Sequence, residues 1–288
     1  MQPGLSFEQI DRATLGVDPE LELAVTYNRV VGASLTRIWE NVFDWQHLPV
    51  LHDTYCNHVE LMEIGVAGWR VKLTKQPGDP DRLLDLELRI DKANTRYRVR
   101  TLAGDGTGTE IWTLLKPLSP DSTQIEVRYY LPEKRPEKRD MLGAKYRGSC
   151  QRLWDEDEAM MQQRERLANA RRDRRPGPAL PIALGKLDAL LPRLPLVVDV
   201  ETGSFRIVEV EGRLHAHSTV CPHWLGPLDV AVEDGCIRCP WHGFLFDVRS
   251  GESADGRDLR LAPAPPVLVD PMTGDVTLAP ITANALAR

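Results

Sequence analysis

Two short groups of potential metal ligands near the C-terminal end of the chain constrain its fold more than any other feature. The first group holds Cys221 and His223, the second holds Cys239 and His242, and fifteen residues separate the two groups. Two short loops folded tip to tip would bring the four side chains together. Two thiolates on one iron and two neutral imidazoles on the other are the mixed ligation of a 2Fe-2S cluster with a raised reduction potential.

A zinc site with two cysteines and two histidines is the competing interpretation. Zinc motifs usually pair cysteines with cysteines and histidines with histidines, with a helix between the pairs. Here each group mixes the two residue types, and residues 228–238 have the pattern of two short strands around an Asp234-Gly235 turn. The sequence therefore favours the cluster over zinc. Cys236 stands outside the spacing and is interpreted as a buried or spare thiol.

The proline after each of the two ligand cysteines, and the run Cys-Pro-Trp-His-Gly-Phe-Leu-Phe-Asp-Val-Arg-Ser-Gly that starts at Cys239, resemble the Rieske 2Fe-2S domain. The resemblance implies an all-β domain in which the four residues named above hold the cluster. Respiratory-type members tie their two loops together with a disulfide, and the matching positions here hold Gly226 and Trp241. This difference implies a lower-potential electron carrier of the kind that serves soluble oxygenases.

The composition sets broad limits on the fold and on the partners. A chain of 288 residues with 42% hydrophobic residues can form two domains with ordinary cores. Its five cysteines do not suit a disulfide framework, and its net charge of −6 argues against nucleic acid as a main partner. The first residues lack the features of a secretory signal, and no run of about eighteen apolar residues predicts a membrane span. We therefore expect a cytoplasmic, reducing location.

The first part of the chain predicts an α+β domain with an antiparallel sheet, residues 21–172, after a polar arm over residues 1–20. Ser34 is placed to cap a helix with an apolar stripe, and a long helix is expected from Leu142 to Arg171. Alternating patterns predict strands at residues 21–31, 58–64, 69–75, 83–90, 96–102, 109–115 and 124–131. The arginine-rich and proline-rich residues 173–193 are expected to form a linker, and residues 194–288 the second domain.

This order of a strand, a short helix, a curved meander and a long closing helix resembles the helix-grip fold of the START and polyketide-cyclase superfamily. The resemblance implies a sheet that wraps around the closing helix and leaves an apolar cavity between them. It also implies a hydrophobic or aromatic small molecule as the ligand of that cavity.

A second metal site is predicted by Asn41, Asp44, His47 and His52 in the first domain. Asp44 and His47 are three residues apart, so they share a face of a helix. Pro49 breaks the regular turn and allows the imidazole of His52 to come round. The pattern resembles the iron-ligand segment of Rieske non-haem iron oxygenases. The resemblance implies that the two histidines bind Fe(II) and that Asp44, with Asn41 beside it, assists catalysis by bonding a ligand and linking the site to a cluster histidine.

A carboxylate would complete a site of two histidines and one acid. In the expected closing helix, at about 100° per residue, Asp157 falls in the middle of an apolar face, where an acid is costly without a cationic partner. Asp155 and Glu158 fall off that face, and Glu156 lies at its margin. The resembling oxygenases also take their third ligand from the closing helix, which favours Asp157. The alternative is that Asp157 pairs with an arginine and that the histidines are polar residues at a helix end.

Together these features predict a Rieske-type non-haem iron oxygenase that hydroxylates or oxidatively demethylates a hydrophobic small molecule with O2. In the resembling family the cluster domain comes first, whereas here it comes second, and spatial adjacency matters more than chain order. A reductase or ferredoxin would bring electrons from NAD(P)H to the cluster, and His223 or His242 would pass them to Asp44 and His47. The family also implies a ring-like oligomer, with a homo-trimer as the expected form.

Two other functions remain open at this point. One is a Rieske electron-transfer protein whose START-like domain binds a ligand without a metal. The other is a dedicated ferredoxin whose extra domain docks a separate oxygenase. Iron bound at His47 and His52 would distinguish the oxygenase from both.

Overall fold

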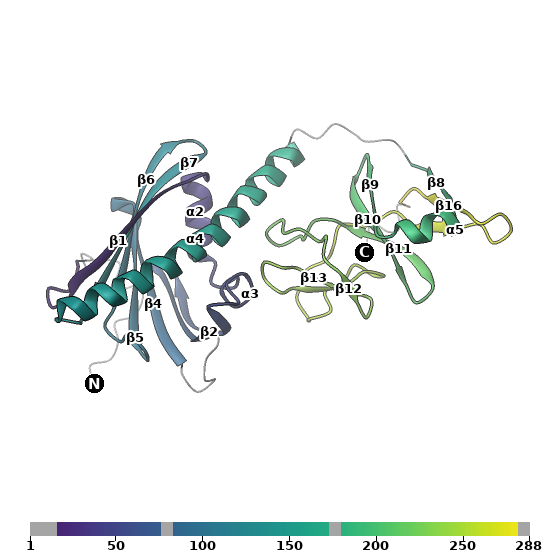
Figure 1. Ribbon diagram of the computed structural model, residues 1–288. Coiled ribbons are helices and arrows are strands. Elements are labelled where there is room, and N and C mark those ends of the chain that lie inside the picture. The colour runs from purple at the N-terminus through teal and green to yellow at the C-terminus, as the bar shows by residue number, and fades with distance from the viewer. Residues whose placement is uncertain (1–15, 76–82, 173–179, 282–288) are drawn as a thin grey trace. The chain divides into compact units, whose positions relative to one another are not determined.

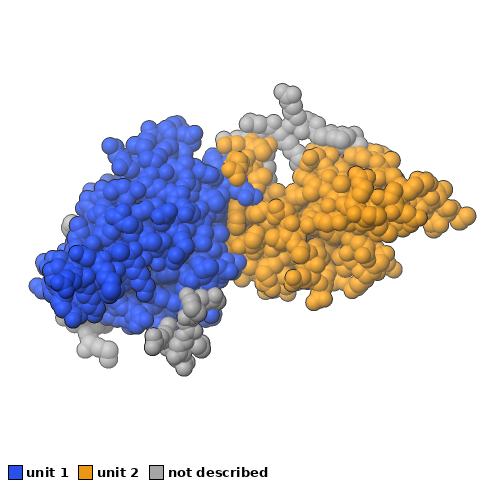
Figure 2. Space-filling view, in the orientation of Figure 1, with its two compact units in different colours: residues 1–165 blue, residues 166–288 orange. Residues whose placement is uncertain are grey.

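The protein divides into two compact units, residues 1–165 and residues 166–288 (Figures 1 and 2). The computed structural model describes residues 16–75, 83–172 and 180–281. Most of the expected N-terminal arm, residues 1–15, lies outside the described residues. No helix among the described residues is both long and apolar enough to cross a membrane.

A seven-stranded antiparallel sheet forms the N-terminal unit, with the strand order β1-β7-β6-β5-β4-β3-β2. In β7 every second side chain is buried, as expected for a strand with one face on a core. The strands are β1 Glu22–Val31, β2 Cys56–Gly65, β3 Gly68–Lys75, β4 Leu83–Asp91, β5 Arg96–Ala103, β6 Glu110–Ser119 and β7 Ser122–Leu131. The expected α+β class and the expected antiparallel sheet are thus confirmed.

The long helix α4 (Pro136–Arg172) crosses this sheet (Figure 1). It begins earlier than expected because a proline suits the first turn of a helix, where its missing N–H costs nothing. Cys150, Trp154 and Met161 of α4 are buried in the core that the sheet forms. Fully burying a large apolar side chain contributes roughly 1.5–3 kcal/mol, so these contacts fix which face of α4 points inward.

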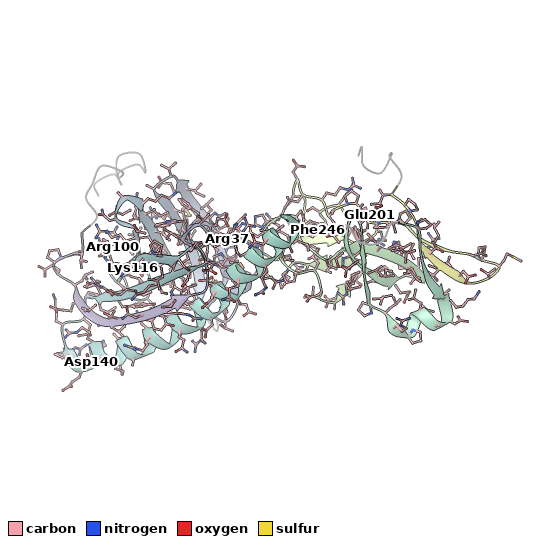
Figure 3. All side chains as sticks on the ribbon, turned by 90° about the horizontal axis from the view of Figure 1, so that it is seen from above. Arg37, Arg100, Lys116, Asp140, Glu201 and Phe246 are labelled. Atoms are coloured by element: carbon pink, nitrogen blue, oxygen red, sulfur yellow. The ribbon has the colours of Figure 1, made fainter. Side chains whose placement is uncertain are left out.

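Two short helices precede the second strand, α2 (Leu35–Phe43) and α3 (Leu48–Leu51), and a 3-10 turn, η1 (Lys92–Asn94), follows β4. As expected, Ser34 caps α2, since its Oγ accepts from the Arg37 N–H over 3.2 Å. Arg37 also lies beside α4 (Figure 3), where its Nε donates to Glu165 Oε2. Arg164 Nε donates to Glu40 Oε2 over 2.9 Å. Partly exposed pairs of this kind stabilise little, about 0–1 kcal/mol, but they set the direction of α2.

Three small antiparallel sheets form the C-terminal unit, in the orders β11-β10-β9, β12-β13-β14 and β15-β16-β8. Phe205, Ile207 and Leu278 lie in its core. The elements are β8 Ile182–Lys186, α5 Leu187–Leu190, η2 Leu191–Arg193, β9 Leu196–Val200, β10 Gly203–Val210, β11 Arg213–Ser218, β12 Val232–Glu233, β13 Cys236–Arg238, β14 Leu245–Asp247, β15 Val267–Val269 and β16 Asp275–Leu278. The expected β-rich second domain is present.

The start of the C-terminal unit differs from the expected linker over residues 173–193. Residues 173–179 lie outside the described part of the chain, but β8, α5 and η2 occupy residues 182–193. β8 pairs antiparallel with β16, from Ile182 opposite Leu278 to Lys186 opposite Asp275. This strand is short and its partner lies far along the chain, so local pattern carried little sign of it.

The hairpin expected between the ligand groups is present. β12 pairs with β13, and the connecting residues Asp234 and Gly235 have φ values of 51° and 75°. Two consecutive positive φ angles are the geometry of a type I′ turn, which Asp-Gly favours. The short strands leave the two flanking loops free to carry ligands.

Candidate metal centres

The two ligand loops of the C-terminal unit close in the same way. In the first loop the Cys221 N–H donates to the Gly226 carbonyl over 2.8 Å, and in the second the Cys239 N–H donates to the Phe244 carbonyl over 2.9 Å. Each ligand cysteine therefore begins a tight loop whose backbone returns to it. This geometry places one thiol and one imidazole on each loop.

The four side chains of these loops form two like pairs. Cys221 is 0% exposed and Cys239 is 1% exposed. A hydrogen bond with Cys221 lowers the pKa of Cys239, and the same contact raises the pKa of Cys221. The rings of His223 and His242 lie 4.4 Å apart between centroids, edge to face. Sulfur beside sulfur and imidazole beside imidazole is the ligand arrangement that a cluster with two cysteines on one iron requires.

Gly226 leaves room for the sulfur of the opposite loop. A Cβ atom at this position would lie 2.7 Å from Cys239 Sγ and 3.1 Å from the Trp241 ring. Any larger residue would therefore push into the ligand set. All five cysteines are free thiols in this structure.

The spacing of the ligand atoms favours a cluster over zinc. In a tetrahedral zinc site every ligand atom lies about 2.0–2.3 Å from one ion, so all four atoms crowd together. Among the described residues, no three of these four offer ligand atoms within 4.8 Å of one another. The four residues thus fit two metal ions better than one.

In the N-terminal unit the structure brings together His47, His52 and Asp157. Their ligand atoms all lie within 4.8 Å of one another. His47 Nε2 is 3.5 Å and His52 Nε2 is 3.2 Å from Asp157 Oδ1. The single turn of α3 separates the two histidines, with His47 at its start and His52 at its end, so both imidazoles reach the same face of α4.

Each of these three side chains has a further polar partner. Asp44 Oδ2 lies 3.2 Å from His47 Nδ1, and Glu156 Oε2 lies 2.6 Å from His52 Nδ1. The Asn41 amide donates to Asp157 Oδ1 over 3.0 Å. A carboxylate on Nδ1 favours the tautomer that leaves Nε2 free to ligate a metal.

Glu156 is the residue of this group that sequence reasoning left without a role. It follows Asp155, whose carboxylate faces outward and pairs with Arg29. A rotation of about 100° per residue carries Glu156 round to His52, and its position at the margin of the apolar face was the available signal.

The charges of this group compensate one another. Burial raises the pKa of Asp157, but His52, His47 and Asn41 outweigh it and hold the pKa below its usual value. Burial lowers the pKa of His52, but the carboxylates of Asp157 and Glu156 raise it further and leave it above the usual value. The arrangement therefore stabilises an ionised acid, which is the form that binds a metal ion, beside the charged form of His52, from which a metal ion would displace the proton.

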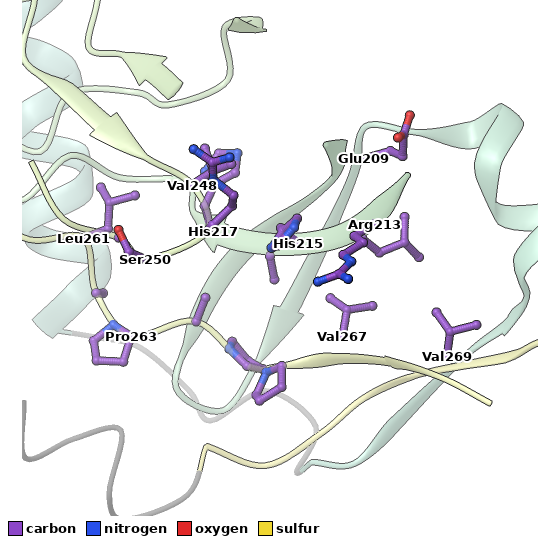
Figure 4. Close-up of a pocket in the computed structure, with 18 of the residues that line it drawn as sticks. Glu209, Arg213, His215, His217, Val248, Ser250, Leu261, Pro263, Val267 and Val269 are labelled. Carbon is purple, nitrogen blue, oxygen red and sulfur yellow. The ribbon is translucent and has the colours of Figure 1, made fainter. Parts of the chain in front are cut away.

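A groove of the C-terminal unit takes no part in either ligand set. Its volume is ≈ 1110 Å³, and Arg213, His215 and His217 of β11 line it (Figure 4). His217 Nδ1 donates to the Ser218 carbonyl over 2.9 Å. No ligand residue of the two centres lies among the residues that line this groove.

The loops define the class of this part of the chain. Residues 182–265 match the family model described as Rieske [2Fe-2S] domain. The C-terminal unit therefore contains a Rieske domain, as expected.

The chain is also similar to several known proteins. Apoptosis-inducing factor 3 of Mus musculus and of Homo sapiens is 37% identical over 70 residues, which cover 20% of this chain and 12% of that protein. The ferredoxin of carbazole 1,9a-dioxygenase from Nocardioides aromaticivorans is 31% identical, with a TM-score of 0.30, over 36% of this chain and 100% of that chain. Zhui aromatase/cyclase from Streptomyces is 17% identical, with a TM-score of 0.42, over 51% of this chain and 98% of that chain.

Proposed function

We propose that this protein is a Rieske-type non-haem iron oxygenase, which hydroxylates or oxidatively demethylates a hydrophobic small molecule with O2. One observation carries the proposal: two buried imidazoles and a half-buried carboxylate offer ligand atoms within 4.8 Å of one another in the unit that has no cluster loops. Two histidines and one carboxylate with open positions are the ligand set of non-haem Fe(II) oxygenases.

In this proposal His47, His52 and Asp157 hold Fe(II), and the bound iron supplies the chemistry of O2 activation. Glu156 accepts from His52 Nδ1 and so presents the Nε2 lone pair of that ring inward, and the Asp44 carboxylate lies 3.2 Å from His47 Nδ1. The Asn41 amide donates to Asp157 and keeps that carboxylate turned toward the histidines. His47 and His52 are each 3% exposed, so the protein around them excludes bulk water.

The interior of the N-terminal unit is rich in buried tyrosines, and for this unit we propose an aromatic or otherwise hydrophobic substrate. Burial, and to a lesser extent the charge of Asp157, raises the pKa of Tyr97, so its phenol stays neutral. Tyr129 stacks on Tyr146, with 5.0 Å between ring centroids, and burial raises the pKa of Tyr55 to about 12. Neutral phenols and aromatic rings can pack against an apolar molecule and donate to a polar group on it.

The proposal includes the remaining partners that the resemblance implies. A reductase or ferredoxin brings electrons from NAD(P)H to the cluster, and the expected assembly is a homo-trimer in the cytoplasm. The domain bounds that we propose are those given above, with the second domain extended to include β8.

A second candidate is a Rieske electron-transfer protein with a metal-free ligand-binding unit. One observation favours it: His52 lies within hydrogen-bonding distance of both Glu156 and Asp157, so these groups satisfy one another without an ion. A buried ion pair of this kind needs good geometry to offset desolvation, and this one has it.

Iron content distinguishes the two candidates. The oxygenase requires three irons per chain, two in the cluster and one at the histidine site. The His47→Ala/His52→Ala double variant is expected to keep two irons per chain, and His58→Ala, an exposed histidine on β2, serves as the matched control. Two irons in wild type and in the double variant alike would remove the oxygenase proposal.

A further inference from the structure

One arginine covers the aromatic ring that lies against the cluster histidines. The Phe244 ring centroid lies 4.5 Å from that of His223 and 5.6 Å from that of His242. On Phe244 the guanidinium carbon of Arg257 lies 3.8 Å from the centroid. Phe244 is 3% exposed, whereas the Arg257 side chain is 41% exposed. The guanidinium therefore separates the ring from solvent.

The loop that carries Arg257 is tied to the second ligand loop. The Ala254 N–H donates to the Leu245 carbonyl over 2.8 Å, and the Leu245 N–H points back to Asp255 Oδ2 over 3.4 Å. Arg257 donates from its N–H to Ser253 Oγ and from Nε to Asp255 Oδ2, each over 3.0 Å. The backbone bonds thus fix the loop, and the guanidinium itself is held by the Asp255 carboxylate and by the Phe244 ring.

This cation lies close to a histidine of the ligand set. Even placed end to end, the separations of 3.8 Å from Arg257 to Phe244 and 4.5 Å from Phe244 to His223 stay below the Debye length of about 10 Å at 0.1 M ionic strength. A buried ring lies between the charge and the histidines, whereas the outer side of the guanidinium faces solvent, so salt screens the interaction only in part. Net charge and solvent exposure are among the factors that set the potential of an iron–sulfur cluster.

We propose that Arg257 tunes the cluster, because its guanidinium favours the reduced state and keeps Phe244 closed over His223 and His242. When the cluster accepts one electron from its redox partner, its charge becomes more negative by one, and a fixed cation nearby stabilises that form. Asp255 has the opposite effect, since it carries the countercharge of Arg257. The proposal rests on the Rieske domain and is independent of any iron in the N-terminal unit.

The test measures the reduction potential of the full-length protein with its cluster, by protein-film voltammetry. Arg257→Gln is expected to lower the potential, and Arg257→Lys, which keeps the charge, is expected to stay close to wild type. Asp255→Asn is expected to raise the potential. Arg193→Gln is the control for the loss of one positive charge, because Arg193 is an exposed arginine of η2, which belongs neither to the ligand loops nor to the loop that carries Arg257.

The signs of the shifts separate a charge effect from a disturbed loop. The shift of Arg257→Gln is also expected to shrink as salt rises, because the guanidinium is partly exposed. A potential in Arg257→Gln equal to that of Arg193→Gln would overturn the proposal, and so would shifts of the same sign in Arg257→Gln and Asp255→Asn. If Arg257→Gln fails to retain its cluster, the shift of Asp255→Asn still tests the proposal, because a lower potential in Asp255→Asn contradicts it.

Discussion

Removal of the Glu156 carboxylate is expected to weaken Fe(II) binding about 10- to 100-fold, the usual effect of losing an outer partner of a metal-binding histidine. Glu156 Oε2 lies 2.6 Å from Nδ1 of His52, which is 3% exposed. Glu156→Ala leaves that N–H without its acceptor and lets the ring turn. In free energy the loss corresponds to about 1.4–2.7 kcal/mol.

Glu156→Gln is expected to lie near the lower end of this range. The amide oxygen still accepts from His52 Nδ1, but a neutral hydrogen bond is roughly half as strong as a charge-assisted one. The assay is titration of Fe(II) against a competing chelator, with the Rieske cluster intact. Asp155→Asn is the control, because it removes the carboxylate next to Glu156 in the sequence, and that carboxylate pairs with Arg29. An unchanged affinity in Glu156→Ala, or an equal loss in Asp155→Asn, would refute the reasoning.

Three further changes test other parts of the structure. Gly226→Ala places a Cβ atom 2.7 Å from Cys239 Sγ and is expected to lower the iron and sulfide content of the C-terminal unit; full occupancy would contradict the described loop contact. Met161→Ala, at a side chain that is 0% exposed, is expected to lower the free energy of unfolding by about 2–5 kcal/mol, as measured by urea denaturation, and a loss below about 1 kcal/mol would argue against the packing of α4. Burial raises the pKa of Glu40, but Arg164 and Arg37 outweigh it and hold the pKa below the usual 4.5. The stability that ionised Glu40 contributes is therefore present above pH 4.5 and is lost as pH falls through the lower pKa that Glu40 has in the folded protein. The difference in unfolding free energy between wild type and Glu40→Gln is therefore expected to vanish in acid. A difference independent of pH would contradict the ion pairs.

Residue pattern was sufficient to predict the antiparallel sheet and the closing helix. Apolar and polar residues alternate along the strands because one face is buried, and the buried apolar side chains of α4 recur at helical spacing. Each element can therefore be predicted from a short stretch of sequence. The same holds for the Asp234-Gly235 turn, whose two residues favour the positive φ angles that the hairpin needs. β8 was missed because it depends on pairing with β16, a contact between distant segments that no local window contains.

The candidate sites also differ in how far local sequence predicts them. The spacing of Cys221, His223, Cys239 and His242 reflects two similar loops, so chain position alone was enough to propose them as ligands. The role of Glu156 depends on the rotation of α4 against α3, and the stacking of Arg257 on Phe244 depends on how two loops meet. Such contacts are set by tertiary packing, and only coordinates reveal them.

The most direct test of the account is Mössbauer spectroscopy of isotopically enriched protein after reduction, because this method counts cluster iron and mononuclear iron separately. The account predicts that one third of the iron is high-spin Fe(II) outside the cluster, that the His47→Ala/His52→Ala variant loses this fraction, and that His58→Ala keeps it. A spectrum in which all iron belongs to the cluster, in wild type as in the double variant, would contradict the oxygenase proposal and leave an electron carrier.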